Sequence, residues 1–248
     1  MFKKLLILFL AFSFFQLGEL KATLYTTVDV ITQYDGPVDA SDVDQKLVCI
    51  RLVVAAGAGA PAATGMTFNL AGFNEVLNAK LYYTGTVATF TAPVLLSTVN
   101  LPGAVVAFTG FNQANAVAGN YYYWLLVDAK AAITNGVKID ADYVSGTYVT
   151  GPPAPGVITL PGFRYTGRYY TIGTGEAYAT VKAAADGISR FDYDHTPNIL
   201  FELTSNYANP VESGAILGMN LHTGIASIII RPALGLVGRV TQGDLSLI

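Results

Sequence analysis

Short apolar and aromatic runs recur along the chain, and turn residues such as Gly, Asn and Pro separate them. Runs of about four to eight residues between turns, with little helical periodicity, are typical of a β-sandwich or barrel. We therefore expect an all-β protein. The pattern predicts strands over residues 24–31, 46–54, 66–70, 79–83, 104–108, 121–127 and 142–149, and a later series over 163–170, 177–183, 199–203, 215–220, 225–231 and 238–247.

A proline-rich segment divides the two series of expected strands. Residues 151–157 carry three prolines, which restrict the backbone and supply no amide donor to a β-ladder. The segment therefore favours two β-sandwich modules in tandem, jelly-roll or immunoglobulin-like, over one larger domain. We expect a first sandwich over residues 23–150, a linker over 151–157 and a second sandwich-like module over 158–248.

The N-terminus has the layout of a secretory signal. Two lysines follow Phe2, an apolar run extends from Leu5 to Phe15, and a small residue, Ala22, follows a short polar stretch. We expect residues 1–22 to be cleaved and the mature protein to be secreted or held at the cell surface. No later segment approaches the length of apolar residues that a transmembrane helix needs.

The charge content excludes some classes of partner. Charged residues make up only 12% of the chain, hydrophobic residues make up 52%, and the net charge is −3. Nucleic acids and anionic membranes attract proteins through a basic surface, which this chain lacks. We therefore expect no nucleic-acid partner and no transmembrane segment.

Residues able to perform catalysis are few. Cys49, the single cysteine, lies in an apolar run that reads as a buried strand, and the two histidines, His195 and His222, have no second histidine at metal-ligand spacing. No nucleophile elbow or zinc motif is present. Glu202 is the one glutamate inside an apolar strand, where it is expected to face outward. The sequence predicts that the protein is not an enzyme.

Two acidic clusters are candidates for a structural calcium ion. Calcium takes six to eight oxygen ligands, and loops rich in carboxylates supply them in extracellular proteins. Solvated turns are the alternative reading of both clusters, and we expect no other cofactor. The clusters are Asp35, Asp39, Asp42 and Asp44 in the first module, and Asp192 with Asp194 in the second.

Consecutive aromatic residues are the strongest functional signal. Tyr and Trp offer a flat apolar face with a polar tip, which suits stacking on a sugar ring or a rigid contact with a protein. Core packing is the alternative, but strand alternation turns some of these side chains outward unless both faces of the sheet are covered. The candidate ligand-binding residues are Tyr82, Tyr83, Tyr121, Tyr122, Tyr123 and Trp124; Tyr165, Tyr169, Tyr170 and Tyr178 form a similar group in the second module.

Three groups of residues follow one another in a fixed order: Ala79, Lys80, Tyr82, Tyr83, Thr84, Gly85 and Phe90 in one strand pair, Gly119, Asn120, Tyr121, Trp124, Leu125 and Asp128 in a later strand, and then Ile139, Asp140 and Ala141. This order, over residues 24–149, resembles the N-terminal accessory domain of bacterial BNR-repeat sialidases (neuraminidases). Sialidase propeller boxes each need a tryptophan, and Trp124 is the only one here. The resemblance therefore implies a sandwich that accompanies glycan cleavage, without the catalytic propeller.

Together these features favour a secreted or cell-surface binding module without catalytic activity, with glycan binding or adhesion as its function. A structural subunit of an extracellular assembly is the alternative, because low charge and exposed strand edges suit self-association. An accessory part of a glycoside hydrolase is a third reading. The expected partners are glycans or cell-surface proteins, with self-association as a further option.

Overall fold

The computed structural model describes residues 25–56, 61–149, 153–160, 162–188, 198–207 and 227–233. The segment expected to be a signal peptide lies outside these residues. Most described residues are in strands, which confirms the all-β class. The elements are β1 (Tyr25–Gln33), β2 (Gly36–Val38), β3 (Gln45–Val54), β4 (Ala62–Ala71), η1 (Phe73–Glu75), β5 (Val76–Tyr83), β6 (Val94–Asn100), β7 (Val105–Phe108), β8 (Gln113–Ala114), β9 (Gly119–Ala129), β10 (Lys138–Tyr148), β11 (Ala154–Pro155), β12 (Arg164–Thr166), β13 (Tyr169–Ile172), α2 (Val181–Ile188), β14 (Asn198–Leu203) and β15 (Ser227–Pro232).

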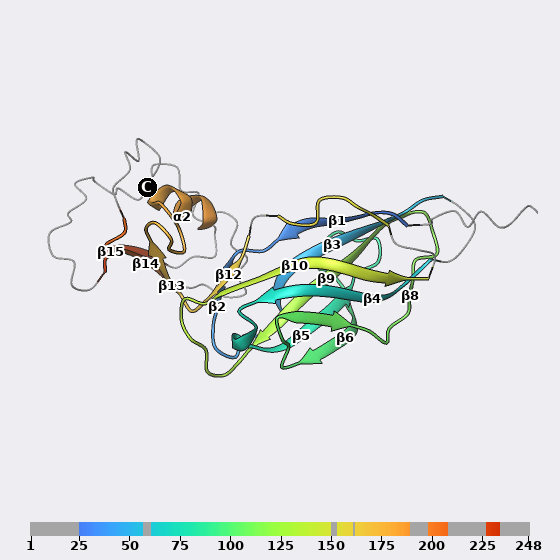
Figure 1. Cartoon of the computed structure of the whole chain (residues 1–248), viewed down its shortest axis with the longest axis horizontal. Coiled ribbons are helices and arrows are strands. Elements are labelled where there is room, and N and C mark those ends of the chain that lie inside the picture. The colour runs from blue at the N-terminus through green and yellow to red at the C-terminus, as the bar shows by residue number, and fades with distance from the viewer. Residues whose placement is uncertain are drawn as a thin grey trace, which may run out of the picture.

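Two sheets form a sandwich (Figure 1). We call the sheet with strand order β11-β1-β3-β9-β5-β6 the first sheet, and the sheet with order β2-β12-β10-β4-β7 the second sheet. The long strands of both sheets pair antiparallel. This pairing allows one face of each sheet to pack on the core while the other can face water.

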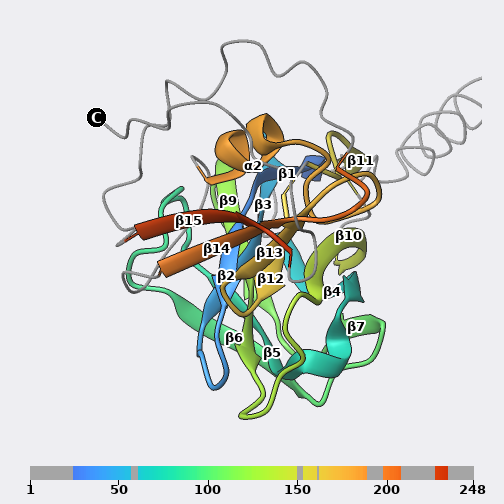
Figure 2. The same cartoon turned by 90° about the vertical axis from the view of Figure 1, so that its left-hand side faces the viewer.

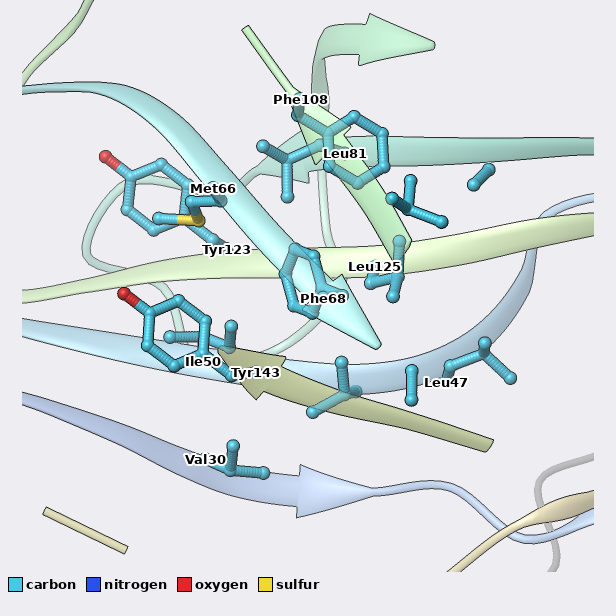
Figure 3. Close-up of a cluster of buried hydrophobic side chains, with 14 of the residues drawn as sticks. Val30, Leu47, Ile50, Met66, Phe68, Leu81, Phe108, Tyr123, Leu125 and Tyr143 are labelled. Atoms are coloured by element: carbon cyan, nitrogen blue, oxygen red, sulfur yellow. The ribbon is translucent and has the colours of Figure 1, made fainter. Parts of the chain in front are cut away.

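The core between the sheets is built from alternate residues of the long strands (Figure 3). Phe68 and Met66 of β4 meet Leu125 and Ile50 of the first sheet, and Phe108 packs edge-on against Phe68 with ring centroids 5.9 Å apart. Each of these side chains is at most 1% exposed. Burying a side chain of this size stabilises the fold by roughly 1.5–3 kcal/mol, so this layer holds the two sheets together.

Strand β9 is buried on both faces, because one face packs on the core between the sheets and side chains on the outer face of the first sheet cover the other. Tyr121, Tyr123 and Leu125 point into the core, whereas Tyr122 and Trp124 join a second apolar cluster on the outer face. All side chains from Tyr121 to Ala129 are buried. The first sheet therefore has a covered patch on the side that faces away from the sandwich.

The proline-rich segment belongs to the sandwich instead of linking two modules. Strand β11 pairs in parallel with β1, and the amides of Gly156 and Val30 bond the carbonyls of Val28 and Val157. An edge strand tolerates proline because one side of its backbone needs no ladder partner. The expectation of a linker at 151–157 is therefore corrected for its described residues, from Pro153 onward.

The chain continues in the sandwich beyond that segment. Strand β12 pairs antiparallel with β10 and parallel with β2. Within β12, Arg164 is only 1% exposed, and its Nε donates to the carbonyl of Lys46 at 2.6 Å. The first module therefore extends at least to Thr166, past the boundary expected at residue 150.

The described residues after Thr166 form a small parallel sheet with order β13-β14-β15 (Figure 2). Parallel strands need crossover connections, and helix α2 lies between β13 and β14 in the chain, where a strand was expected. Thr180 directly precedes the helix, and its Oγ1 accepts the Ala183 amide at 3.0 Å, as in an N-cap. Where a second sandwich was expected, these residues therefore show a parallel sheet with a helix.

Candidate functional site

Three of the predicted ligand-binding tyrosines face the core of the sandwich. Tyr123 is fully buried, Tyr121 is 6% exposed, and Tyr83 packs against the same core, with its ring stacked on that of Tyr121 at 6.4 Å. The prediction that these three residues bind a ligand at the surface is corrected, because the strand alternation turns them inward.

A buried asparagine satisfies the hydroxyls of these tyrosines. The Asn115 Nδ2 donates to Tyr25 at 2.8 Å and to Tyr123 at 3.0 Å, and its Oδ1 accepts the Tyr83 hydroxyl at 2.9 Å. Burial raises the pKa of Tyr25 and of Tyr83 to about 12 and that of Tyr123 further. The hydroxyls therefore stay neutral, and the network closes one end of the core.

The other three candidates, Tyr82, Tyr122 and Trp124, belong to the outer face of the first sheet. Tyr122 is 8% exposed and Trp124 is 2% exposed, so both are covered by neighbouring side chains. Tyr82 is half-buried, and it lies directly opposite Trp124 in the β5–β9 ladder. Of the six predicted residues, Tyr82 alone combines partial exposure with this outer face.

Two further aromatic residues, Phe90 and Tyr34, pack on Trp124 from outside the strands. The ring of Phe90 lies 5.4 Å from Trp124 and 5.5 Å from Tyr82, edge-on to both, and the ring of Tyr34 lies 6.2 Å from Trp124. Both are half-buried. We call Tyr34, Tyr82 and Phe90, with Trp124 beneath them, the outer aromatic cluster. Of these four residues, Tyr34 alone carried no signal in the sequence.

The loop after β5 carries Phe90 back over the sheet, and Thr84 anchors it. Thr84 Oγ1 accepts the indole Nε1 of Trp124 at 2.9 Å and donates to the carbonyl of Val87 at 2.7 Å. The backbone of Thr84 and Gly85 continues the ladder with Tyr122. The position of Phe90 is therefore tied to that of the buried indole.

A charged network borders the cluster. Lys80 Nζ donates to Asp44 at 2.9 Å and to Asp128 at 2.8 Å, and Asn78 donates to the second Asp128 oxygen at 2.9 Å. The Tyr82 hydroxyl donates to Asp44 at 3.1 Å. Lys46 adds a cation beside the rings, 5.4 Å from the centroid of Tyr34. Polar groups able to bond hydroxyls thus border an aromatic surface.

Burial and hydrogen bonding act in opposite directions on this network. Burial alone would raise the pKa of Asp128, but hydrogen bonds from Lys80 and Asn78 outweigh it and hold the pKa below its ordinary value. Burial would likewise lower the pKa of Lys80, and its bonds to the two carboxylates raise it instead. Both groups therefore stay ionised at neutral pH, and neither is poised to transfer a proton.

The four aspartates of the first acidic cluster each bind a different group. Asp35 is buried and accepts the Phe163 amide at 2.9 Å, Asp39 pairs with Arg168 at 2.5 Å, and Asp42 accepts the Asp39 amide at 2.7 Å. Asp44 binds Lys80. Among the described residues no group of three or more His, Cys, Asp or Glu is placed to hold a metal. Asp192 and Asp194, like His195 and His222, lie outside the described residues.

Glu202 of β14 is 5% exposed and is bound on both oxygens. The Tyr169 hydroxyl donates to it at 2.5 Å, and Arg231 donates through Nε and Nη2 at 2.8 and 2.6 Å. Burial favours a raised pKa, but the two partners lower it. The hydrogen bond to Glu202 raises the pKa of Tyr169 to about 12. Glu202 is therefore held as an anion in an ion pair.

Comparison with known proteins finds weak structural similarity to a sialidase. No protein-family model matches the chain, and no curated protein does. Among solved structures, the Hadza microbial sialidase Hz136 is similar over 57% of this chain, with 15% sequence identity and a TM-score of 0.45. The match covers 31% of that sialidase. A likeness of this degree carries no argument about ligand or activity, and the sialidase accessory domain stays a prediction.

The described helices are also short. None of those in the part of the chain that the structure describes has the length and apolarity of a membrane span.

Proposed function

We propose that this protein is an exported, non-catalytic glycan-binding module and that the outer aromatic cluster is its binding site. The observation that supports this proposal is the half-buried pair Tyr82 and Phe90, set beside Lys80 and Asp44 on the outer face of the first sheet. An aromatic face stacks on the apolar face of a sugar ring. Charged and amide groups at its border bond the sugar hydroxyls and fix their orientation.

The ionisation of the site supports binding over catalysis. Glycoside hydrolysis needs two carboxyl groups about a sugar, one of them kept protonated. Here the hydrogen bonds from Lys80 and Asn78 lower the pKa of Asp128, and Lys80 also bridges to Asp44. These carboxylates therefore serve as fixed acceptors. Export follows from the expected signal at residues 1–22 and belongs to the same proposal.

A glycan array and affinity electrophoresis in mucin and polysaccharide gels test the proposal. We expect at least one glycan to retard the protein, and Tyr82→Ala to weaken that binding by about tenfold or more, because the stacking ring is lost. Tyr82→Phe keeps the ring and should keep most of the affinity. Tyr169→Ala, a half-buried tyrosine of the small sheet, is the matched control and should bind like the wild type.

The outcomes separate the parts of the proposal. If no glycan retards the wild type, glycan binding is wrong. If Tyr169→Ala weakens binding and Tyr82→Ala does not, the site lies in the C-terminal part of the chain and the outer aromatic cluster is structural. Turnover of a fluorogenic glycoside by the wild type would contradict the absence of catalysis.

A further inference from the structure

One long stretch of the chain carries no charge. From Leu81 to Val127 there is no Asp, Glu, Lys, Arg or His, although charged residues make up 12% of the whole chain. This stretch forms β6 and β7, the turn between them and most of β9. Because β9 is buried, the surface that the stretch supplies comes from β6, β7 and their turn, together with the mostly exposed segments at residues 85–93 and 109–118.

Strands β6 and β7 are edge strands on the same side of the sandwich. Strand β6 ends the first sheet and β7 ends the second, and the two contact each other across the short turn at residues 101–104. Figure 1 shows β6 along the lower margin of the sandwich. We call β6, β7 and this turn the neutral margin.

The neutral margin exposes large apolar side chains. Val94 is 56% exposed, Leu95 48%, Leu101 67% and Val105 62%. Single exposed apolar residues are ordinary on a protein surface. Four of them on β6, β7 and the turn between them, with no charged residue in any of the three, form the kind of surface found at the centre of protein interfaces.

The opposite margin of the sandwich, unlike the neutral margin, is protected against pairing with the strands of another chain. There the first sheet ends in β11, a two-residue strand that contains Pro155, and the second sheet ends in β2, a three-residue strand that contains Pro37. Short strands and prolines are devices that prevent edge-to-edge pairing. Strand β6 has seven residues, VLLSTVN, with neither proline nor lysine.

We propose that the neutral margin is a self-association surface, at which β6 pairs antiparallel with β6 of a second copy of this chain. The absence of charge argues for this occupant. A two-fold contact brings the same surface of both copies together, so a charged surface would meet charges of its own sign, and here none occur. A charged partner would find no counter-charge on this surface. The net charge of −3 is carried by the rest of the chain.

Analytical ultracentrifugation and light scattering of the mature chain test this proposal. We expect a concentration-dependent dimer or larger assembly for the wild type. Leu95→Lys should raise its dissociation constant by about tenfold or more, because each copy would bring a charge into an apolar contact that has no counter-charge. Val144→Lys is the matched control, since Val144 is also 48% exposed but lies on β10 in the interior of the second sheet. It should associate like the wild type.

Val105→Lys on β7 provides a second variant, and circular dichroism checks that each variant folds. Loss of association in either margin variant, with an unchanged control, supports the proposal. A wild type that is monomeric at every concentration overturns it. So does an assembly that persists in both Leu95→Lys and Val105→Lys, or one that the control variant disrupts as strongly. None of these readouts depends on glycan binding.

Discussion

Trp124 and Thr84 are joined by a hydrogen bond of 2.9 Å from the indole Nε1 to the threonine Oγ1. The Thr84 hydroxyl in turn donates a hydrogen bond to the carbonyl of Val87, in the loop that carries Phe90. The single tryptophan of the chain is thus connected to the loop that covers it. Because the indole is 2% exposed, water cannot replace Thr84 as its acceptor.

Replacing Thr84 with Val therefore tests this connection. The variant keeps the shape of the side chain but leaves a buried donor without an acceptor, which we expect to cost about 1–3 kcal/mol of unfolding free energy. Urea unfolding followed by Trp124 fluorescence measures the loss. Thr84→Ser keeps the hydroxyl and should lose less. Equal stability of the wild type and Thr84→Val would show that the bond does not hold the loop.

Two glycines with the same backbone conformation should respond differently to substitution. Gly72 and Gly85 have φ of +65° and +66°, a left-handed conformation that costs an alanine about 1–2 kcal/mol. A Cβ at Gly72 would collide with the backbone carbonyl of Lys138, whereas one at Gly85 meets nothing within 4 Å. We expect Gly72→Ala to lose about 1–3 kcal/mol more than Gly85→Ala. Thermal unfolding of both variants gives the comparison.

The network around Lys80 gives a pH dependence with a defined sign. The pKa of Asp128 is lowered below 3.8, so its stabilising contribution is present above that pH and is lost as the pH falls through the folded value. The pKa of Lys80 is raised above 10.5, so its contribution is present below that pH and is lost as the pH rises through the folded value.

Lys80→Met should accordingly lose about 1–3 kcal/mol at neutral pH. The difference in unfolding free energy between this variant and the wild type should narrow below about pH 4, as Asp128 becomes protonated, and above about pH 10.5, as Lys80 loses its proton. Chemical denaturation across this range measures it. Lys138→Met breaks an exposed pair with Asp140, whose lysine is 45% exposed, and should lose less than about 1 kcal/mol. A pH-independent loss in Lys80→Met would show that packing, and not charge, is responsible.

Most strands of the first module could be predicted because their apolar runs are dense and bounded by turns. The run at 121–127 falls within β9 and that at 46–54 within β3. Strand β6 was missed, since an edge strand with exposed valines and leucines shows little alternation. The run at 177–183 was predicted as a strand but α2 begins at Val181, because short apolar runs fit either structure.

The candidate site was harder to predict than the fold. Consecutive bulky residues in β9 indicated that either both faces were covered or one was open to a ligand. Which of these two alternatives holds depends on the path of the loop after Thr84, and the local sequence does not determine that path. Tyr34 lies outside the strands that surround Trp124, so only the folded chain places it in the outer aromatic cluster.

Trp124 fluorescence gives the most direct test of glycan binding at the outer aromatic cluster. The chain has one tryptophan, and its ring contacts Phe90 and lies near Tyr34, so a sugar at the cluster should change its emission. Titration with the glycan that retards the protein most should give a saturable change in the wild type and none in Tyr82→Ala. Binding that saturates while the emission of Trp124 stays constant would place the ligand elsewhere and contradict the proposed site.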